Sequence, residues 1–520
     1  MVRILLALLL AQADQDLKRI REVLNQAEET AGTVKEPYLE SKAWAEVAEV
    51  RAASGDGEGA LKLLEKIPNA YEKSLGYASV AKALAKAGNG EGARRVAMRG
   101  LKACDEGDQD FKSPNAYAHL VIALAEAGDL DGAVKRLEAV PGGPTGQEFA
   151  IKDVAFVLAK KGRIEGAIAL LARGPVDDWT YVRGIEDMVK EADPASTLPL
   201  VKRISEMHLR GKALESIVKE QVRRGRMDDA VATARTIEDP SYKVSTLLWV
   251  ADELRERKKE LASELLSLAN SSADAISEPS QKCRAWAGLA RSWAKSGKAE
   301  SAARSAELSE KAQREITEEW MRRWALREVA AAHAAGGKLA KALEIAATDT
   351  EAAREEILTE IARSQVEVGD IQGALKTVEP CKNSFHRSQI LFAVSKRETK
   401  PQEVRKRLHE AAGAMDTVET SPKSLNDIRN GNPNQEHLYH LMEAMAKAGD
   451  FEGSVKVGQR IRKDMGHWFG GFALRRAAEW QAEAEKLEEA LAWIDKIDEA
   501  LPKSLALIGA AEGALKRVKR

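Results

Sequence analysis

The sequence predicts an all-α protein in which one helix-turn-helix repeat recurs along the chain. Three observations support this: a helix-favouring composition, a recurring segment centred on glycine, and apolar residues at helical spacing on both sides of that glycine. Of 520 residues, 44% are apolar but only 5% are aromatic, and 15 are proline. This composition is typical of helices with enough apolar surface for a large core, rather than of a disordered chain.

The recurring segment follows one pattern in nine copies, counted here from the central glycine of each. The residue eight positions before the glycine is aliphatic, and the residue seven before is usually small. The residue five positions after the glycine is alanine, except for Ser454. The repeat glycines are Gly55, Gly88, Gly128, Gly162, Gly225, Gly297, Gly337, Gly369 and Gly449.

Each copy is predicted to form two amphipathic helices joined at the glycine. Around Gly128, apolar residues lie at helical spacing at Leu120 and Leu124 before the turn and at Ala133 and Leu137 after it. The glycine ends the first helix by adopting a positive φ, and the Asp or Asn that follows caps the second helix. The small residues let the helices approach, and a bulkier side chain would cost about 1 to 3 kcal/mol.

Longer gaps between glycines are predicted to contain eroded repeats. The largest spacings, 63, 72 and 80 residues, each leave room for one more turn, near Asp193, Arg257 and Thr399, and a last one is expected near Glu485. Because one helix pair cannot bury both of its apolar faces, neighbouring repeats must stack. The sequence therefore predicts a single array of about 13 helix-turn-helix units with a concave and a convex face.

This pattern resembles the tetratricopeptide repeat (TPR), a helix-turn-helix of 34 residues. The resemblance covers residues 35–500 and implies a TPR-like solenoid, a right-handed α-α superhelix that binds proteins. The chain diverges from the family four positions before the glycine, where an aromatic residue is expected and Leu84, Leu124, Leu158, Gln221 and Gln365 stand instead. Capping helices are expected at residues 14–34 and 501–520.

The first 13 residues allow two interpretations. A basic start, the apolar stretch Ile4 to Ala11 and the small-residue site Ala11-Gln12-Ala13 resemble a signal peptide, which would send the protein to the periplasm or the cell exterior. The segment is nevertheless shorter than the usual range of roughly 15 to 30 residues. The alternative is an N-terminal capping helix that continues into the fold of a cytoplasmic protein. The longest apolar run, eight residues, is far shorter than the roughly 20 of a transmembrane helix.

Three segments rich in Ser, Asp, Asn, Gly and Pro are predicted to be surface loops: 104–115, 270–279 and 416–435.

Motifs for catalysis, metals or cofactors are not found in the sequence. Cys104, Cys283 and Cys381 are too far apart for a short-spaced metal motif, and we expect them to be buried as small apolar residues. The glycine-rich strings 55–59 and 88–92 follow helices rather than strands, which predicts turns and not phosphate-binding loops. His437 and His440 are three residues apart without a third ligand, which favours an ordinary pair. The chain is therefore predicted to be non-catalytic and to need no cofactor.

The resemblance implies that the first helix of each repeat lines a groove, with exposed side chains 13, 10, 6 and 2 positions before the glycine. In the middle of the chain these positions are mostly cationic, with aromatic residues between them. The predicted groove residues are Lys152, Phe156, Lys160, Lys212, Lys219, Arg223, Arg284, Arg291, Lys295, Arg327 and Arg363.

This groove predicts a protein or peptide partner of acidic character, because cationic heads beside aromatic rings suit carboxylates. Alternatively, the long side chains only solvate a helix face. With 80 basic and 81 acidic residues, the chain is unsuited to nucleic-acid binding driven by bulk charge. Two further alternatives are a helical repeat that binds single-stranded RNA and an enzyme whose site is built from the long loops.

Overall fold

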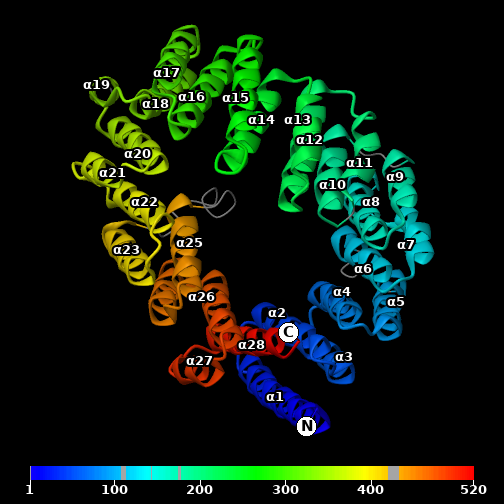
Figure 1. The fold of residues 1–520 in the computed structure, drawn as a ribbon. Coiled ribbons are helices and arrows are strands. Elements are labelled where there is room, and N and C mark those ends of the chain that lie inside the picture. Colours follow the sequence, from blue (N-terminus) through cyan, green and yellow to red (C-terminus); the bar gives the residue numbers. More distant parts are fainter. Residues whose placement is uncertain are drawn as a thin grey trace. The chain divides into compact units, whose positions relative to one another are not determined.

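The computed structural model describes residues 2–106, 113–141, 143–173, 177–191, 193–348, 350–419 and 432–519. Every regular element in these residues is a helix, which confirms the all-α prediction (Figure 1). None of the helices described is long and apolar enough to cross a membrane. The helices belong to two compact units: unit 1 comprises Met1–Val176 and Glu419–Arg520, and unit 2 comprises Asp177–Val418.

Unit 1 combines the two ends of the chain. Its helices are α1 (Val2–Ala31), α2 (Pro37–Ala53), α3 (Gly57–Lys66), α4 (Ala70–Lys86), α5 (Gly90–Glu106), α6 (Pro114–Glu126), α7 (Leu130–Arg136), η1 (Leu137–Ala139), α8 (Gly143–Lys160), α9 (Ile164–Arg173), α25 (Pro433–Lys447), α26 (Phe451–Glu483), α27 (Leu487–Ile494) and α28 (Ala500–Val518).

Unit 2 is a stack of helix pairs in which α12, α14, α16, α18, α20 and α22 each pack on the next. Its helices are α10 (Asp178–Glu191), α11 (Pro194–Val201), α12 (Met207–Arg223), α13 (Met227–Arg235), α14 (Pro240–Leu254), α15 (Lys259–Asp274), α16 (Pro279–Lys295), α17 (Ala299–Arg314), α18 (Glu319–Ala335), α19 (Leu339–Ala347), α20 (Glu351–Val368), α21 (Ile371–Val378), α22 (Ser384–Ser395), α23 (Pro401–Ala414) and η2 (Met415–Thr417).

The repeat glycines form the turns as predicted. All nine adopt a positive φ, between 70° and 98°. In the first copy, the N–H of Asp56 donates to the carbonyl of Arg51 (2.9 Å) and that of Gly55 donates to the carbonyl of Ala52 (3.1 Å). These two bonds close a Schellman turn, which requires the left-handed conformation that glycine adopts without steric cost.

The residue after the glycine caps the second helix in five copies. The Asp56 carboxylate accepts the N–H of Gly59 at 2.9 Å. A Cβ on Gly59 would overlap that carboxylate, which explains the third glycine of the string 55–59. The turn interpretation of this string is thus confirmed. The other capping residues are Asn89, Asp129, Asp370 and Asp450.

The conserved spacing of aliphatic and small residues forms the contact between helices. Each residue five positions after a repeat glycine is at most 1% exposed, and so is each residue eight positions before it. Such complete burial confirms that both positions lie in the core, as the repeat pattern predicts. The first set comprises Ala60, Ala93, Ala133, Ala167, Ala230, Ala302, Ala342, Ala374 and Ser454, and the second Val47, Val80, Leu120, Val154, Ile217, Leu289, Val329, Ile361 and Leu441.

Turns between helices are found at all four predicted eroded sites, near Asp193, Arg257, Thr399 and Glu485. They are built in different ways. The turn after α26 keeps the left-handed residue, which is Glu485 with φ 67°. The turn after α14 is one residue shorter than a glycine turn, because the N–H of Lys258 donates to the carbonyl of Leu254 (2.8 Å), four residues back rather than five.

Replacing Glu485 by glycine should stabilise unit 1. A left-handed φ costs a residue with a Cβ roughly 1 to 2 kcal/mol, and the greater freedom of glycine in the unfolded chain offsets part of that gain. We therefore expect Glu485→Gly to raise the free energy of unfolding by about 0.5 to 1 kcal/mol, measured by urea denaturation. The control Ala484→Gly, at φ −84°, should lower it, and a loss of stability in both variants would contradict this explanation.

The two ends of the chain meet in unit 1. Helix α28 packs against α26 on one side and against α1 and α2 on the other, and the hydroxyl of Ser504 donates to the carbonyl of Ala27 at 3.0 Å. The predicted terminal helices therefore pack on each other. Among residues 12–31 of α1, for which burial is described, the buried ones are Ile20, Val23, Leu24, Ala27 and Ala31.

Two of the predicted loops start later than expected. Helix α15 continues to Asp274 because Ala273 is fully buried, so the loop predicted at 270–279 is confined to its last residues. Helix α5 likewise includes Cys104, which is buried. Residues 107–112 and 420–431, which hold most of the other two predicted loops, lie outside the described residues. Export, the handedness of the superhelix, the number of repeats and the domain boundaries stay predictions.

Candidate functional site

The predicted groove residues lie on the first helices of their repeats. Lys152, Phe156 and Lys160 belong to α8 in unit 1, and the other eight lie on α12, α16, α18 and α20 in unit 2. The structure therefore divides the predicted groove between two units, and unit 2 contains the larger part.

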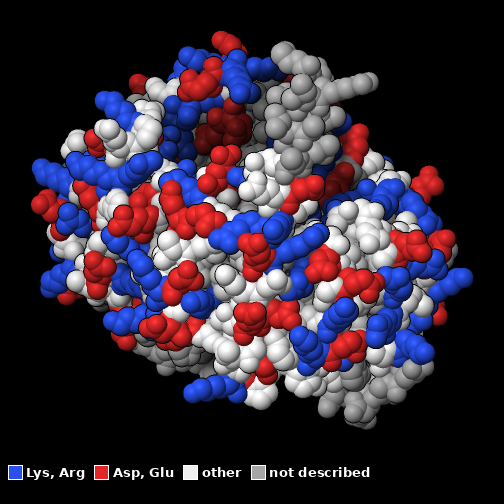
Figure 2. Space-filling view, turned by 90° about the horizontal axis from the view of Figure 1, so that it is seen from below, with Lys and Arg blue, Asp and Glu red and all other residues white. Residues whose placement is uncertain are grey.

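Most of the groove cations have acidic partners. Arg291 pairs with Glu328 at 3.0 Å and Arg363 with Glu360 at 2.8 Å. These carboxylates stand nine positions before their glycines, next to a groove position, and were missed because only the groove positions were compared. The mixture of basic and acidic side chains is also evident on the surface (Figure 2). The remaining pairs are Lys152 with Asp153, Lys212 with Glu186, Lys219 with Glu215, Arg223 with Glu220, and Arg327 with Glu356.

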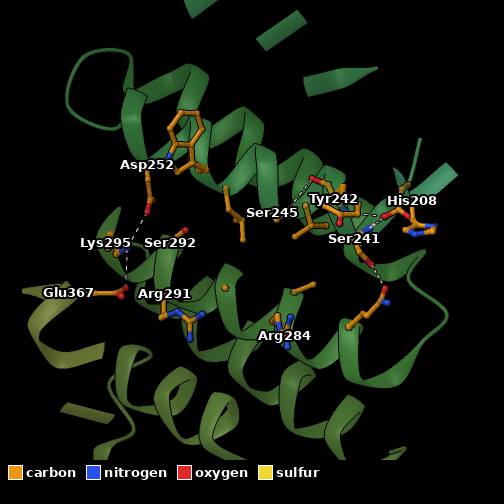
Figure 3. Close-up of a pocket in the computed structure, with 17 residues that line it drawn as sticks. His208, Ser241, Tyr242, Ser245, Asp252, Arg284, Arg291, Ser292, Lys295 and Glu367 are labelled. Atoms are coloured by element: carbon orange, nitrogen blue, oxygen red, sulfur yellow. Dashed lines mark hydrogen bonds and ion pairs between the residues drawn. The ribbon is translucent and has the colours of Figure 1, made fainter. Parts of the chain in front are cut away.

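A cleft opens in unit 2 between α14 and α16. It has a volume of about 650 Å³ and brings together three predicted groove residues, Arg284, Arg291 and Lys295. All three come from α16, where spacings of seven and four residues place them on one face (Figure 3). The opposite wall comes from α14, with His208 of α12 at one end and Glu367 of α20 at the other.

The floor of the cleft depends on a glycine. A Cβ on Gly288 of α16 would lie 2.8 Å from Cδ1 of Leu248 on α14, closer than van der Waals contact allows. Glycine therefore lets the two helices approach at this point. Tyr242 and Trp249, both half-buried, contribute aromatic surface to the α14 wall.

The cations deep in the cleft are neutralised. The ammonium of Lys295 lies 3.0 Å from Asp252 and 3.1 Å from Glu367 (Figure 3). Burial lowers the pKa of Arg291, but the carboxylates around it outweigh burial, so that the pKa is raised overall and the guanidinium stays charged. These pairs fix the shape of the cleft.

Arg284, unlike Arg291 and Lys295, stacks on an aromatic ring rather than pairing with a carboxylate. Its guanidinium lies over the ring of Trp324, 4.5 Å from the ring centroid, and the side chain is exposed. No hydrogen bond or ion pair joins it to another residue within the described ranges. Stacking on an aromatic face leaves the in-plane N–H groups of an arginine available, and these can hold a carboxylate by two parallel hydrogen bonds.

Sequence comparison missed the α14 wall because of the short turn. Ser245, Leu248 and Asp252 line the cleft. They stand 12, 9 and 5 positions before Arg257, which marks this turn, whereas the corresponding groove residues of the other repeats stand 13, 10 and 6 positions before the glycine. Aligning this repeat on its buried residues Val250 and Ala262, with one residue deleted from the turn, would have revealed them.

The histidines and cysteines do not form a metal centre in the described part of the chain. His437 is buried, whereas His440 is half-exposed and lies 3.6 Å from Glu436. The described residues contain no group of three or more His, Cys, Asp or Glu that could hold a metal ion. Cys104 and Cys283 are buried, as predicted, and Cys381 is partly buried. Burial raises the pKa of Cys283 and Cys381 to about 11, which keeps both thiols protonated.

Comparison with known proteins finds similarity to solved structures at low TM-scores. No protein-family model and no curated protein sequence matches the chain. Among solved structures, Naa15/Naa10 bound to HypK-THB is 16% identical, with a TM-score of 0.27, covering 98% of this chain and 88% of that chain. The pentatricopeptide repeat protein PPR10 from maize is 13% identical, with a TM-score of 0.25, and the match covers 92% of this chain and 70% of that one. Ton1535 from Thermococcus onnurineus NA1 is 14% identical, with a TM-score of 0.22, covering 74% and 100%.

The fold is a TPR-like helical repeat. The regular helix pairs, the glycine turns and the buried alanines carry this conclusion. The TM-scores are too low to transfer any function from these proteins.

Proposed function

We propose that the chain is a non-catalytic scaffold that binds an acidic, extended segment of a partner protein along the first helices of unit 2. The observation that carries this proposal is Arg284, a cation of the cleft that makes no hydrogen bond or ion pair with a carboxylate of the described residues, although Glu278 is near enough to interact with it electrostatically. In this binding mode, a Glu or Asp side chain of the partner is held by the Arg284 guanidinium.

The cleft offers suitable surroundings for such a segment. Leu248 and Trp249 provide an apolar wall. Apolar side chains of the partner would bury this surface and stabilise the complex. Ser245 is exposed and can hydrogen-bond to an extended backbone. An extended peptide is recognised in this way, by polar groups for its main chain and by pockets for its side chains.

The same face is less suited to a polyanion. Binding of nucleic acid depends on several cations that neutralise phosphates, and here the neighbours of Arg284 already face carboxylates. A partner with one or two well-placed acidic groups fits this distribution better than RNA does. The scaffold is proposed to be non-catalytic because the three acidic groups of the cleft are engaged. Asp252 and Glu367 are held by Lys295, and Asp239 accepts the N–H groups of Ser241 and Tyr242 at the start of α14.

Selection from a random peptide library displayed on phage tests this proposal with the full chain as bait. We expect the selected peptides to be enriched in Asp and Glu, because one carboxylate must pair with Arg284. Binding of these peptides as synthetic fluorescent probes should weaken at least about tenfold in Arg284→Gln, since a charge-assisted bidentate pair is lost. Fluorescence anisotropy measures the affinities.

The matched control is Arg304→Gln, which removes an exposed arginine from the second helix α17 and should leave peptide binding unchanged. Selection of peptides without acidic residues, or equal binding to Arg284→Gln, would overturn the proposal. Binding of single-stranded RNA that depends on Arg284, with no peptide selected, would favour the RNA-binding alternative instead.

A further inference from the structure

Unit 1 contains a second pocket of different chemistry. It lies between α2 and α4, both first helices of their repeats, with His119 of α6 at one side. Its volume of about 380 Å³ is within the range of pockets that hold small organic groups. Three glutamates line it, Glu46 and Glu49 from α2 and Glu72 from α4.

Glu72 has a buried oxygen without a partner. The residue is only 4% exposed, and its Oε1 atom receives no hydrogen bond. A buried carboxylate oxygen without a donor is unfavourable, so such atoms call for a ligand or another donor. Burial raises the pKa of Glu72, although Lys42 and the Tyr38 hydroxyl act in the opposite direction.

Glu49 also faces the pocket unpaired. No hydrogen bond or ion pair connects its carboxyl group to a described residue, whereas Glu46 is held by Arg475 at 2.6 Å. The groups around Glu49 come from several helices: Glu46 on its own helix, Glu512 on α28, Arg475 on α26 and Lys86 on α4. Burial is the main cause that raises the pKa of Glu49 to about 7. The nearby carboxylates of Glu46 and Glu512 also raise it, whereas Arg475 and Lys86 lower it.

We propose that this pocket binds an alkylammonium or alkylguanidinium group, such as the end of a lysine or arginine side chain, between Glu49 and Oε1 of Glu72. The N–H groups of the cation would neutralise the unpaired carboxylate of Glu49 and, once the Glu72 side chain turns toward the pocket, supply the donor that its inaccessible Oε1 lacks. The lysines of the pocket do not take the place of this cation. Lys42 lies over the Tyr38 ring, 4.6 Å from its centroid, and leaves Oε1 of Glu72 without a donor.

An organic cation fits this pocket better than a metal ion. The three glutamates do not belong to a set of ligands close enough to hold a metal within the described residues. A flexible alkyl chain can instead place one cationic head between two separated carboxylates. This site differs in charge, unit and ligand from the Arg284 cleft, so the two proposals are tested independently.

The proposed binding depends on pH. The cation requires the charged form of Glu49, and near neutral pH part of the Glu49 population is protonated. Binding therefore releases a proton, and the affinity should rise between about pH 6 and pH 8. Lys42 and Lys82 line the same pocket, and Lys86 acts on Glu49 from α4. Burial and Lys82 lower the pKa of His119, which favours the neutral ring.

Binding of Nα-acetyl-lysine methylamide to the full chain, followed by ligand-observed NMR and calorimetry, tests the proposal. The uncharged control is Nα-acetyl-norleucine methylamide, and agmatine tests a free cation. We expect the lysine probe or agmatine to bind and the norleucine probe not to bind. Glu49→Gln and Glu72→Gln should each weaken binding about tenfold or more, whereas Glu58→Gln on the second helix α3 should not.

Equal binding to the parent and to both pocket variants would overturn the proposal, and so would binding of the norleucine probe or no binding of either cation at about pH 8. Glu49→Gln is expected to fold normally because it removes a partly desolvated charge without changing shape, and far-UV circular dichroism checks this. If Glu72→Gln fails to fold, the comparison of Glu49→Gln with the parent across pH decides the outcome.

Discussion

Replacing either Gly509 or Gly513 by alanine should strongly destabilise unit 1. Both glycines lie on the face of α28 that meets α26, one turn apart. A Cβ at Gly509 would overlap the carbonyl of Arg475, and a Cβ at Gly513 would overlap that of Glu479. Because the obstructing atoms are backbone, the two helices must separate. We expect each substitution to cost about 2 to 3 kcal/mol, the upper part of the range for overpacking.

Urea denaturation followed by circular dichroism measures this loss, and limited proteolysis should show earlier cleavage in the segments of unit 1. Gly413→Ala is the control, because a Cβ at that position meets nothing within 4 Å. Gly413 is the next-to-last residue of α23, where helix propensity counts for less than in a helix interior, so this change should alter the free energy of unfolding by less than about 0.5 kcal/mol. Stability of Gly509→Ala equal to that of the parent would show that α26 and α28 are less tightly packed than described.

Local features of the fold were predictable from the sequence because each depends on a few neighbouring residues. A glycine turn needs only Gly55 and the hydrogen bonds of its own helix ends, and it recurs identically at Gly449. The contacts of Ala60 and Val47 are likewise made within one repeat or with the next. The repetition of such features supplied enough independent copies to infer helix pairs, their turns and their buried faces.

The features that depend on distant residues could not be predicted in the same way. Arg475 and Glu46, which are 429 positions apart, show no pattern that links them, and neither lies in a position shared by all repeats. Gly509 and Gly513 are visible as a pair but stand outside the repeat pattern. In the candidate site, the partners of Arg291 and Arg363 were missed for a simpler reason, since Glu328 and Glu360 stand one position away from the groove positions.

Replacing Arg475 by methionine should cost unit 1 about 3 kcal/mol. The guanidinium donates to Glu512 through Nε (2.9 Å) and Nη2 (2.8 Å) and to Glu46 through Nη1 (2.6 Å), and its side chain is only 11% exposed. It therefore joins α26 and α28 to α2. Methionine keeps much of the apolar stem but leaves two partly buried carboxylates without a cation, which is the costly way to break a buried ion pair.

Two further variants separate charge from packing in this prediction. Arg476→Met changes the neighbouring arginine, and it should cost less than about 1 kcal/mol because Lys516 remains beside its partner Glu479. Adding Glu46→Gln and Glu512→Gln to Arg475→Met should restore most of the lost stability, since no unpaired charge then remains. A deficit in Arg475→Met that these two substitutions leave unchanged would mean that apolar packing of α1 and α2 on α28, and not this ion pair, holds the two ends of the chain together.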